Sequence, residues 1–223
     1  MNIYEEIKEV NKNNQNKIAL GLVRTDGTLL KYTYKEMFEK IEICSNNFIK
    51  LGIKQGFRIG IVAPSSPEWV INYLAIQKIK ATAVLIDASL EKEEILKLIE
   101  KSDLRAIIFN KDICNKIGIM ENMPNIKLEN FGGLFADSKV NECRKTKIEE
   151  KTNISTIIYS SGTTKTASGI MHNSDSLINT TKMTIKTVGL KRNSTFLGML
   201  PNSHIYGVIT QILRTSTFVS FCI

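Results

Sequence analysis

The sequence predicts an α/β fold in which layers of parallel β-sheet are flanked by helices. Short apolar segments of strand length alternate along the chain with longer segments whose apolar residues recur every three or four positions. The resulting β-α-β-α-β order implies a parallel sheet with right-handed crossovers. The composition agrees, because 43% hydrophobic and 23% charged residues with 4 prolines are typical of a globular chain and exclude disorder as the main state.

The first predicted elements are a weak strand and an amphipathic helix. Residues 29–34 alternate weakly in polarity, and a helix is predicted directly after them at residues 35–51. Gly52 follows at the position where a left-handed residue commonly ends a helix. The apolar side chains that repeat at helical spacing are Met37, Ile41, Cys44, Phe48 and Leu51.

Further strand and helix pairs continue the pattern. Residues 58–62 form a compact apolar strand. Ser66 as N-cap and Pro67 as first helical residue then predict a helix at residues 67–78. The next elements, in order, are a strand at 83–86, a helix at 91–101 preceded by Ser89, and a strand at 105–109.

Periodicity fades between residues 110 and 151, where we expect loops and short elements. We predict a boundary near residue 150, with a first α/β subdomain at residues 1–150 and the truncated start of a second at residues 151–223. The second part opens with a buried strand at 154–159, continues through a loop rich in small hydroxyl residues, and reaches a helix that runs from Ser174 or Asp175 to Val188.

Charge, cysteine and histidine usage limit the function classes. The net charge is +8, but lysine is mixed with glutamate along the whole chain, so no nucleic-acid partner is predicted. Widely spaced cysteines and an N-terminus without an apolar signal core favour a reducing cytoplasm. No apolar run approaches the roughly 18–20 residues that span a bilayer, so no transmembrane segment is predicted. With His172 and His204 as its 2 histidines, the chain is expected to hold no protein-only zinc site.

A loop at residues 160–169 carries the groups that a polyphosphate requires. Glycines let backbone N–H groups approach phosphate oxygens, hydroxyl groups donate hydrogen bonds, and Lys165 supplies positive charge. The loop is not a Walker A motif, because Ala167 and Ser168 stand where that pattern requires glycine and lysine. On composition alone, an ordinary polar surface loop is the more common outcome.

Several segments, in order, resemble motifs of the adenylate-forming superfamily, which includes acyl-CoA and aryl-CoA ligases, peptide-synthetase adenylation domains and luciferases. Residues 159–164, Y-S-S-G-T-T, are similar to the phosphate-loop signature Y-T-S-G-T-T-G-x-P-K-G. The resemblance covers essentially the whole chain. The other matching segments are residues 32–37 with L-T-Y-x-E-L, Pro67-Glu68-Trp69 followed by residues 75–87 with L-A-x-L-K-A-G-A-x-x-V-P-L-D, and residues 200–207 with L-P-x-x-H-x-x-G.

This resemblance implies the first part of the large N-terminal domain of an adenylate-forming enzyme. The family reaction joins a carboxylic acid and ATP into an acyl adenylate, which a thiol such as CoA then consumes. ATP, Mg²⁺ and CoA are therefore the implied cofactors, and a small-molecule carboxylate, as in fatty acid metabolism, is the implied substrate. His204 is implied as a catalytic residue that lines the carboxylate pocket, with a packed core residue as the alternative, and His172 is interpreted as structural. The residues implied at the phosphates are Ser160, Ser161, Gly162, Thr163, Thr164, Lys165 and Gly169.

The sequence departs from the family pattern in two places, within the phosphate loop and after the His204 motif. Lys165 stands at the flexible glycine of the phosphate loop, Ser168 at its lysine and Ala167 at its proline. In the family, the ribose-binding acid, the adenine-binding segment and the lid lysine come after the His204 motif, so we expect a truncated chain that is inactive alone. The alternatives are a non-catalytic remnant or binding module and a fragment of a peptide-synthetase adenylation domain. Residues 218–223 are apolar and β-prone, which predicts self-association through this edge.

Overall fold

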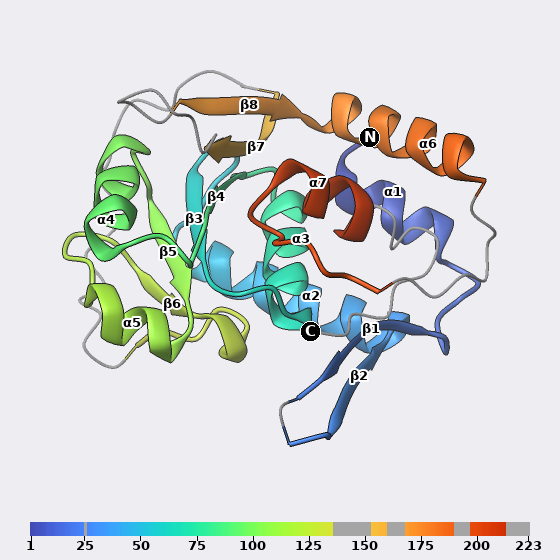
Figure 1. The fold of residues 1–223 in the computed structure, drawn as a ribbon, viewed down its shortest axis with the longest axis horizontal. Coiled ribbons are helices and arrows are strands. Elements are labelled where there is room, and N and C mark those ends of the chain that lie inside the picture. Colours follow the sequence, from blue (N-terminus) through green and yellow to red (C-terminus); the bar gives the residue numbers. More distant parts are fainter. Residues whose placement is uncertain (25, 136–152, 160–167, 190–196, 213–223) are drawn as a thin grey trace.

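A six-stranded sheet organises the computed structural model, which describes residues 1–24, 26–135, 153–159, 168–189 and 197–212 (Figure 1). The strand order is β6-β5-β3-β4-β7-β8, and all neighbours are parallel except β8, which is antiparallel to β7. The strands are β3 (Arg58–Val62), β4 (Thr82–Ile86), β5 (Ala106–Phe109), β6 (Asn125–Lys127), β7 (Ile154–Tyr159) and β8 (Gly169–Asn173).

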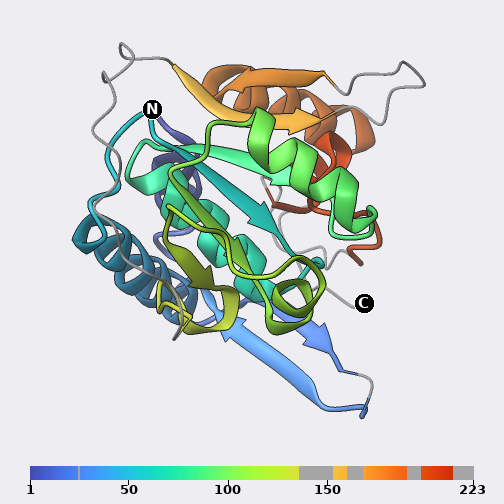
Figure 2. The ribbon, with the colours of Figure 1, turned by 90° about the vertical axis from the view of Figure 1, so that its left-hand side faces the viewer.

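Helices cover both faces of this sheet. Helices α4 (Lys92–Lys101) and α5 (Lys111–Ile117) lie on one face, which Figure 2 views from the front. The opposite face packs against a larger group of helices (Figure 1). Those helices are α1 (Ile3–Val10), α2 (Tyr34–Lys50), α3 (Pro67–Lys78) and α6 (Ser174–Val188), and α7 (Ile205–Gly207) continues into a π-helical turn at Val208–Ile212.

The central strands are apolar throughout because both of their faces are covered. In β4 every residue is buried. Ala83 and Leu85 join the core under α3, whereas Val84 and Ile86 join the core under α4. A strand with two covered faces has no solvent side, so the sequence shows a continuous apolar run and not an alternation.

Helix α3 begins where the capping residues indicate and packs at the centre of the larger core. Ser66 accepts a hydrogen bond from the Trp69 N–H at 3.1 Å, and Pro67 is the first helical residue. The rings of Trp69 and Tyr73 are stacked with centroids 5.6 Å apart. Because nearly the whole circumference of α3 is apolar and buried, this helix is an internal layer and not a surface helix.

A small antiparallel hairpin lies outside the main sheet. Strands β1 (Ile18–Val23) and β2 (Leu29–Thr33) pair with each other and extend from the body of the molecule (Figures 1 and 2). Thr33 then caps α2, accepting from the Glu36 N–H at 3.2 Å while the Glu36 carboxylate accepts from the Thr33 N–H at 2.7 Å. This capping box fixes the direction in which the chain enters α2.

The predicted α/β fold with a mostly parallel, helix-flanked sheet is confirmed. The elements expected at 58–62, 67–78 and 154–159 have the observed bounds. The chain after residue 151 contributes β7 and β8 to the same sheet as β3, so sheet pairing crosses the boundary predicted near residue 150, which stays a prediction. Among the described helices, none has the length and apolar character needed to cross a bilayer. The elements that we did not predict include α1, β1, β8 and α7, and α5 and β6 were expected only as unspecified short elements between residues 110 and 151.

Candidate functional site

The carboxyl ends of β3, β4 and β7 form the edge of the sheet at which polar residues collect. Strand β4 lies between β3 and β7, and all three run in the same direction. Ser65 follows β3, Asp87 follows β4, and the predicted phosphate loop follows β7 at Tyr159. Open α/β sheets bind ligands outside the carboxyl ends of their strands, so this edge is the candidate site.

The chain leaves β3 and β4 toward opposite faces of the sheet. After β3 it enters α3, which packs on one face, and after β4 it enters α4, which packs on the other. The loops that follow these two neighbouring strands therefore diverge at the carboxyl edge of the sheet. Ser65 and Asp87 lie in these two loops.

A segment from the C-terminal part of the chain lies against the loops that follow β3 and β4. The Asn202 N–H donates to the Ser65 hydroxyl oxygen at 2.9 Å. His204 Nε2 lies 3.3 Å from Asp87 Oδ2. These two contacts join the L-P-N-S-H segment to the ends of β3 and β4, although they are far apart in the sequence.

Gly207 allows the sharp fold of this segment. A Cβ atom at Gly207 would lie 2.1 Å from the Pro201 carbonyl oxygen, a distance that no side chain tolerates. The His204 N–H donates to the same Pro201 oxygen at 3.1 Å, and the Val208 N–H donates to the His204 oxygen at 3.0 Å. The proline and glycine of the L-P-x-x-H-x-x-G pattern therefore meet in space, which explains their spacing.

His204 is accessible at this edge. Its side chain is 42% exposed and that of Asp87 is 24% exposed. The alternative that His204 is a packed core residue is therefore wrong. Asp87 Oδ1 accepts from the Ser89 N–H at 2.9 Å and from the Ser89 hydroxyl at 2.8 Å, which holds the carboxylate in a side-chain turn.

The described residues of the phosphate loop are its flanks. Tyr159 ends β7 and pairs with Gly169 at the start of β8. A Cβ atom on Gly169 would lie 3.1 Å from Ile157 Cγ2 and 3.3 Å from a Tyr159 ring carbon, so close strand packing favours glycine there. The role of Gly169 toward phosphate stays a prediction. Six predicted phosphate contacts lie outside the described residues: Ser160, Ser161, Gly162, Thr163, Thr164 and Lys165.

Some buried side-chain polar atoms have no hydrogen-bond partner, and one such residue, Asn202, is two positions from His204. In the parts of the chain that the structure describes, these atoms are Trp69 Nε1 and both amide atoms of Asn202. Asn202 is 1% exposed. An unpaired buried donor or acceptor costs about 1–3 kcal/mol, so such groups are uncommon away from functional sites. Asn202, Asp87 and Ser65 were not among the site residues predicted from the sequence, although polar residues directly after buried parallel strands are a signal for such a site.

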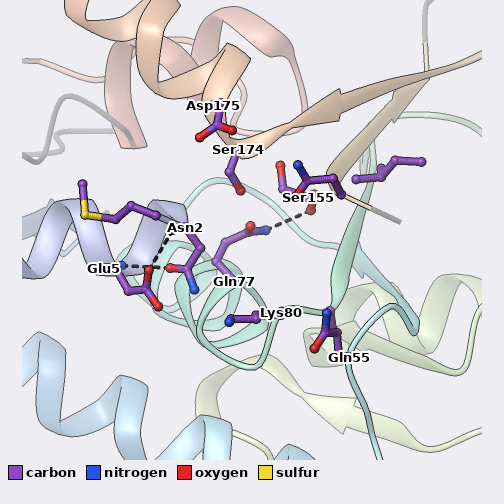
Figure 3. A pocket seen from close by; sticks show the side chains of 12 residues that line it. Asn2, Glu5, Gln55, Gln77, Lys80, Ser155, Ser174 and Asp175 are labelled. Carbon is purple, nitrogen blue, oxygen red and sulfur yellow. Dashed lines mark hydrogen bonds between the residues drawn. The ribbon is translucent and has the colours of Figure 1, made fainter. Parts of the chain in front are cut away.

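A polar cavity lies at the opposite, amino-terminal edge of the sheet (Figure 3). It has a volume of about 320 Å³ and lies between the first residues of α1, α6, β4 and β7. Gln77 donates to the Ser155 carbonyl at 3.0 Å on its wall, and Glu5, Lys80 and Asp175 supply charges of both signs. Neither Gly169 nor His204, the predicted site residues that the structure describes, lines this cavity.

His172 lies on β8, away from the carboxyl-edge site. Its backbone carbonyl accepts from the Ser155 hydroxyl at 3.2 Å, and it pairs with Thr156 in the strand register. Burial lowers the pKa of His172 below its ordinary value, because a desolvated imidazole disfavours the charged form. These contacts agree with a structural role.

The profile of the AMP-binding enzyme family matches residues 7–217. The chain therefore belongs to this family of adenylate-forming enzymes. The match covers the β7 strand, the phosphate loop and the His204 segment together.

Curated relatives include acyl-CoA and aryl-CoA ligases. The chain is 25% identical over 221 residues to the long-chain-fatty-acid–CoA ligase ACSBG2 of Xenopus laevis, which covers 84% of this chain and 29% of the relative. It is 25% identical over 197 residues to 4-coumarate–CoA ligase 3 of Arabidopsis thaliana, and this match covers 82% of this chain and 35% of the relative. It is 24% identical over 206 residues to the long-chain-fatty-acid–CoA ligase FadD13 of Mycobacterium tuberculosis, covering 86% and 40%. The chain thus spans well under half the length of these relatives.

Solved structures share the fold. The N-terminal domain of FACL13 from Mycobacterium tuberculosis has a TM-score of 0.81 and 21% identity, covering 100% of this chain and 57% of that one. The fatty acyl-adenylate ligase of L. pneumophila, solved with acyl adenylate and pyrophosphate, has a TM-score of 0.81 and 16% identity, covering 99% and 39%. The peptide-synthetase structure McyG A-PCP has a TM-score of 0.79 and 14% identity, covering 100% and 36%. The predicted fold of the first part of an adenylate-forming N-terminal domain is confirmed.

Proposed function

We propose that this chain is the N-terminal part of an ATP-dependent acid–thiol ligase, acting on a carboxylic acid such as a fatty acid. One observation carries the proposal: the two flanks of the phosphate loop, Tyr159 and Gly169, pair at the same sheet edge to which Asp87 binds the His204 segment. The loop proposed to bind polyphosphate follows β7, and the histidine proposed to bind a carboxylate contacts the residue that follows the neighbouring strand β4.

The polar groups at this edge fit a ligand with anionic oxygens. His204 is exposed and carries ring nitrogens that can donate hydrogen bonds, and the Asn202 amide has a buried donor and acceptor without partners. The Asp87 carboxylate faces His204 and has its other oxygen occupied by Ser89. We propose ATP, Mg²⁺ and CoA as cofactors from family membership.

In the proposed reaction the residues of this chain act by placement and charge. The substrate carboxylate attacks the α-phosphorus of ATP, so the adenylyl group is transferred to it and pyrophosphate leaves. Hydroxyls of Ser161, Thr163 and Thr164 donate to phosphate oxygens, and Gly162 lets the backbone approach them. His204 receives the substrate carboxylate. Preorganised donors of this kind lower the barrier because they need not reorient when charge develops.

We expect the 223-residue chain to bind pyrophosphate but not to form acyl adenylates at a rate like that of the family's enzymes. The reason is that the ribose-binding acid and lid lysine of the family have no counterpart in its sequence, and solvent does not replace such placed charges. The assay is carboxylate-dependent exchange of pyrophosphate into ATP, with laurate, 4-coumarate and phenylalanine as acids. Robust exchange with any of them contradicts the inactivity, and the acid that supports it separates an acyl-CoA ligase from a peptide-synthetase domain.

Binding is measured separately by calorimetry. Thr163→Ala with Thr164→Ala should weaken pyrophosphate binding about tenfold or more, because each hydroxyl donates a charge-assisted hydrogen bond. Thr180→Ala with Thr187→Ala, on the exposed side of α6, is the matched control and should leave binding unchanged. If adenosine binds as tightly as pyrophosphate, the phosphate loop is not the site.

A non-catalytic binding module is the second candidate. The observation in its favour is that Lys165 and Ser168 stand where the family's phosphate-loop pattern has glycine and lysine. Binding of pyrophosphate without exchange in any mixture, including one supplemented with the remaining part of a relative, supports this candidate. The cytoplasm, proposed from the cysteine pattern, is the expected location in both cases.

A further inference from the structure

The Asp87 carboxylate is fixed at one oxygen and available at the other. Oδ1 accepts two hydrogen bonds from Ser89, at 2.9 and 2.8 Å, while Oδ2 lies 3.3 Å from His204 Nε2. An ionised carboxylate can only accept hydrogen bonds. His204 Nε2 is therefore stabilised beside Oδ2 when this nitrogen carries the ring proton.

Backbone hydrogen bonds hold His204 in place. The His204 N–H donates to Pro201 and its carbonyl accepts from Val208, so the residue is held at the start of α7. Among the described charged side chains, Asp87 is the one within ion-pair distance of His204. His204 and Asp87 are thus each held by local hydrogen bonds in addition to their contact with each other.

We propose that Asp87 is a positioning residue that keeps the proton of the neutral His204 imidazole on Nε2 and leaves Nδ1 free to meet the substrate carboxylate. The role of Nδ1 rests on the proposed function. When a carboxylate binds, the ring takes up one proton from solvent at Nδ1, this N–H donates to the carboxylate, and Asp87 balances the charge of the imidazolium. The same logic applies to histidines whose second nitrogen is held by a carboxylate in other sites.

The test measures which ring nitrogen carries the proton. Nitrogen chemical shifts of the imidazoles in the ¹⁵N-labelled full chain distinguish a protonated nitrogen from a bare one, above the pH at which the rings become neutral. His204 should carry its proton on Nε2. The chain has 2 histidines, so His172 on β8 serves as the internal reference.

Asp87→Asn should reverse the tautomer of His204. Asparagine forms the same turn through its amide oxygen, so the oxygen stays with Ser89 and the NH₂ group faces His204 Nε2. Nε2 must then accept a hydrogen bond, and the ring proton moves to Nδ1. Asp87→Ala leaves neither an acceptor nor a donor at this position to face Nε2, so it should give a mixture of tautomers. A purely structural Asp87 would not reverse the tautomer.

Asp26→Asn is the matched control. Asp26 forms the same kind of turn with Thr28, at 2.9 Å to its N–H and 2.6 Å to its hydroxyl, on the β1–β2 hairpin. This substitution should leave the His204 signals unchanged. A wild-type His204 with its proton on Nδ1, or an Asp87→Asn variant that keeps the wild-type tautomer, overturns the proposal.

Laurate binding separates this proposal from the proposed function. Asp87→Asn should weaken laurate binding about tenfold, because the Nδ1–H donor then belongs to a neutral ring and its hydrogen bond to the carboxylate is no longer charge-assisted. Absence of laurate binding in every variant, with the tautomer reversal present, contradicts the proposed function and supports the positioning role of Asp87. Equal laurate affinity in wild type and Asp87→Asn contradicts the role given to Nδ1.

Discussion

Lys80 shows how one residue can be held in an unfavourable backbone conformation. It follows α3 as the residue after the C-cap and has φ 57°, in the left-handed region that favours glycine. Its N–H donates to the Gln77 carbonyl at 3.1 Å, and its own carbonyl accepts from the Gly56 N–H at 3.0 Å. Counted back from Asp87, Lys80 stands where the strand-entry motif has glycine. The tight turn between α3 and β4 therefore imposes this conformation on a lysine.

We expect Lys80→Gly to stabilise the protein by about 1 kcal/mol, because glycine adopts positive φ without the Cβ clash. The free energy of unfolding in urea is the measurement. Lys97→Gly is the matched control: Lys97 is an exposed residue inside α4, where glycine should destabilise by about 1 kcal/mol. A loss of stability in Lys80→Gly would mean that the lysine side chain contributes more at the cavity wall than the backbone strain removes.

Three helices are joined by one group of polar side chains. Glu42 on α2 accepts from the Tyr4 hydroxyl of α1 at 3.0 Å and from the Lys78 ammonium of α3 at 2.7 Å. Lys78 also donates to Ser45 at 2.9 Å. Burial alone raises the pKa of the Glu42 carboxyl, but the hydrogen bonds from Lys78 and Tyr4 outweigh burial and hold this pKa below its ordinary value.

Glu42→Gln should therefore reduce stability at neutral pH and have less effect in acid. Because the folded-state pKa of Glu42 is lowered, its contribution is present above the unfolded value of 4.5 and is lost as the pH falls through the folded value. The side chain of Glu42 is 45% exposed, so we expect no more than about 1 kcal/mol. The measurement is the free energy of unfolding in urea for wild type and variant across this pH range, with Glu39→Gln on the exposed side of α2 as the control. A stability difference that is independent of pH would contradict the charge pairing.

Elements with their own start and stop signals were predictable, and those made by pairing were not. Ser66 and Pro67 mark the start of α3, and its predicted bounds agree with the observed ones. Strand β8 has no such signal, since its neighbouring residues Ile170 and Met171 are both exposed and its state depends on pairing with β7. Helix α1 did carry a signal, the capping box of Asn2 and Glu5, although this helix was not among the predicted elements.

The candidate site was predictable only where a motif marked it. His204 lies in the L-P-x-x-H-x-x-G pattern, and the structure brings it to the sheet edge. Asp87 and Ser65 lie in different loops, and no local pattern encodes their contacts with residues 202 and 204. Such contacts depend on strand order, which decides which loops become neighbours.

At the scale of the whole molecule, exposed apolar side chains are common in the later part of the described chain. The large apolar residues exposed between 170 and 206 are Ile170, Met171, Met183, Val188, Leu197, Met199, Leu200 and Tyr206. In the described sheet β8 is the last strand, so its outer edge has unpaired backbone groups there. Residues 218–223, on which we based the prediction of self-association, lie outside the described residues.

We expect removal of the residues after Arg214 to raise solubility and lower the apparent mass in light scattering. The net charge of +8 opposes association, but at ~0.15 M salt this repulsion is screened beyond roughly 8 Å, whereas strand pairing acts at about 5 Å. Replacing Val219 and Phe221 by lysine should give the same result at full length. A full-length chain that stays monomeric at high concentration, with no gain from either change, contradicts self-association through this segment.

The segment that lies on the loops after β3 and β4 can vary in sequence while the fold beneath it stays the same. Its attachment uses one backbone N–H, one histidine ring and a glycine, whereas the side chains of Leu197, Met199 and Tyr206 stay exposed. Substitutions at these exposed positions should therefore leave the strands beneath undisturbed. Sequence variation can accumulate in this segment while the sheet and its register keep one architecture.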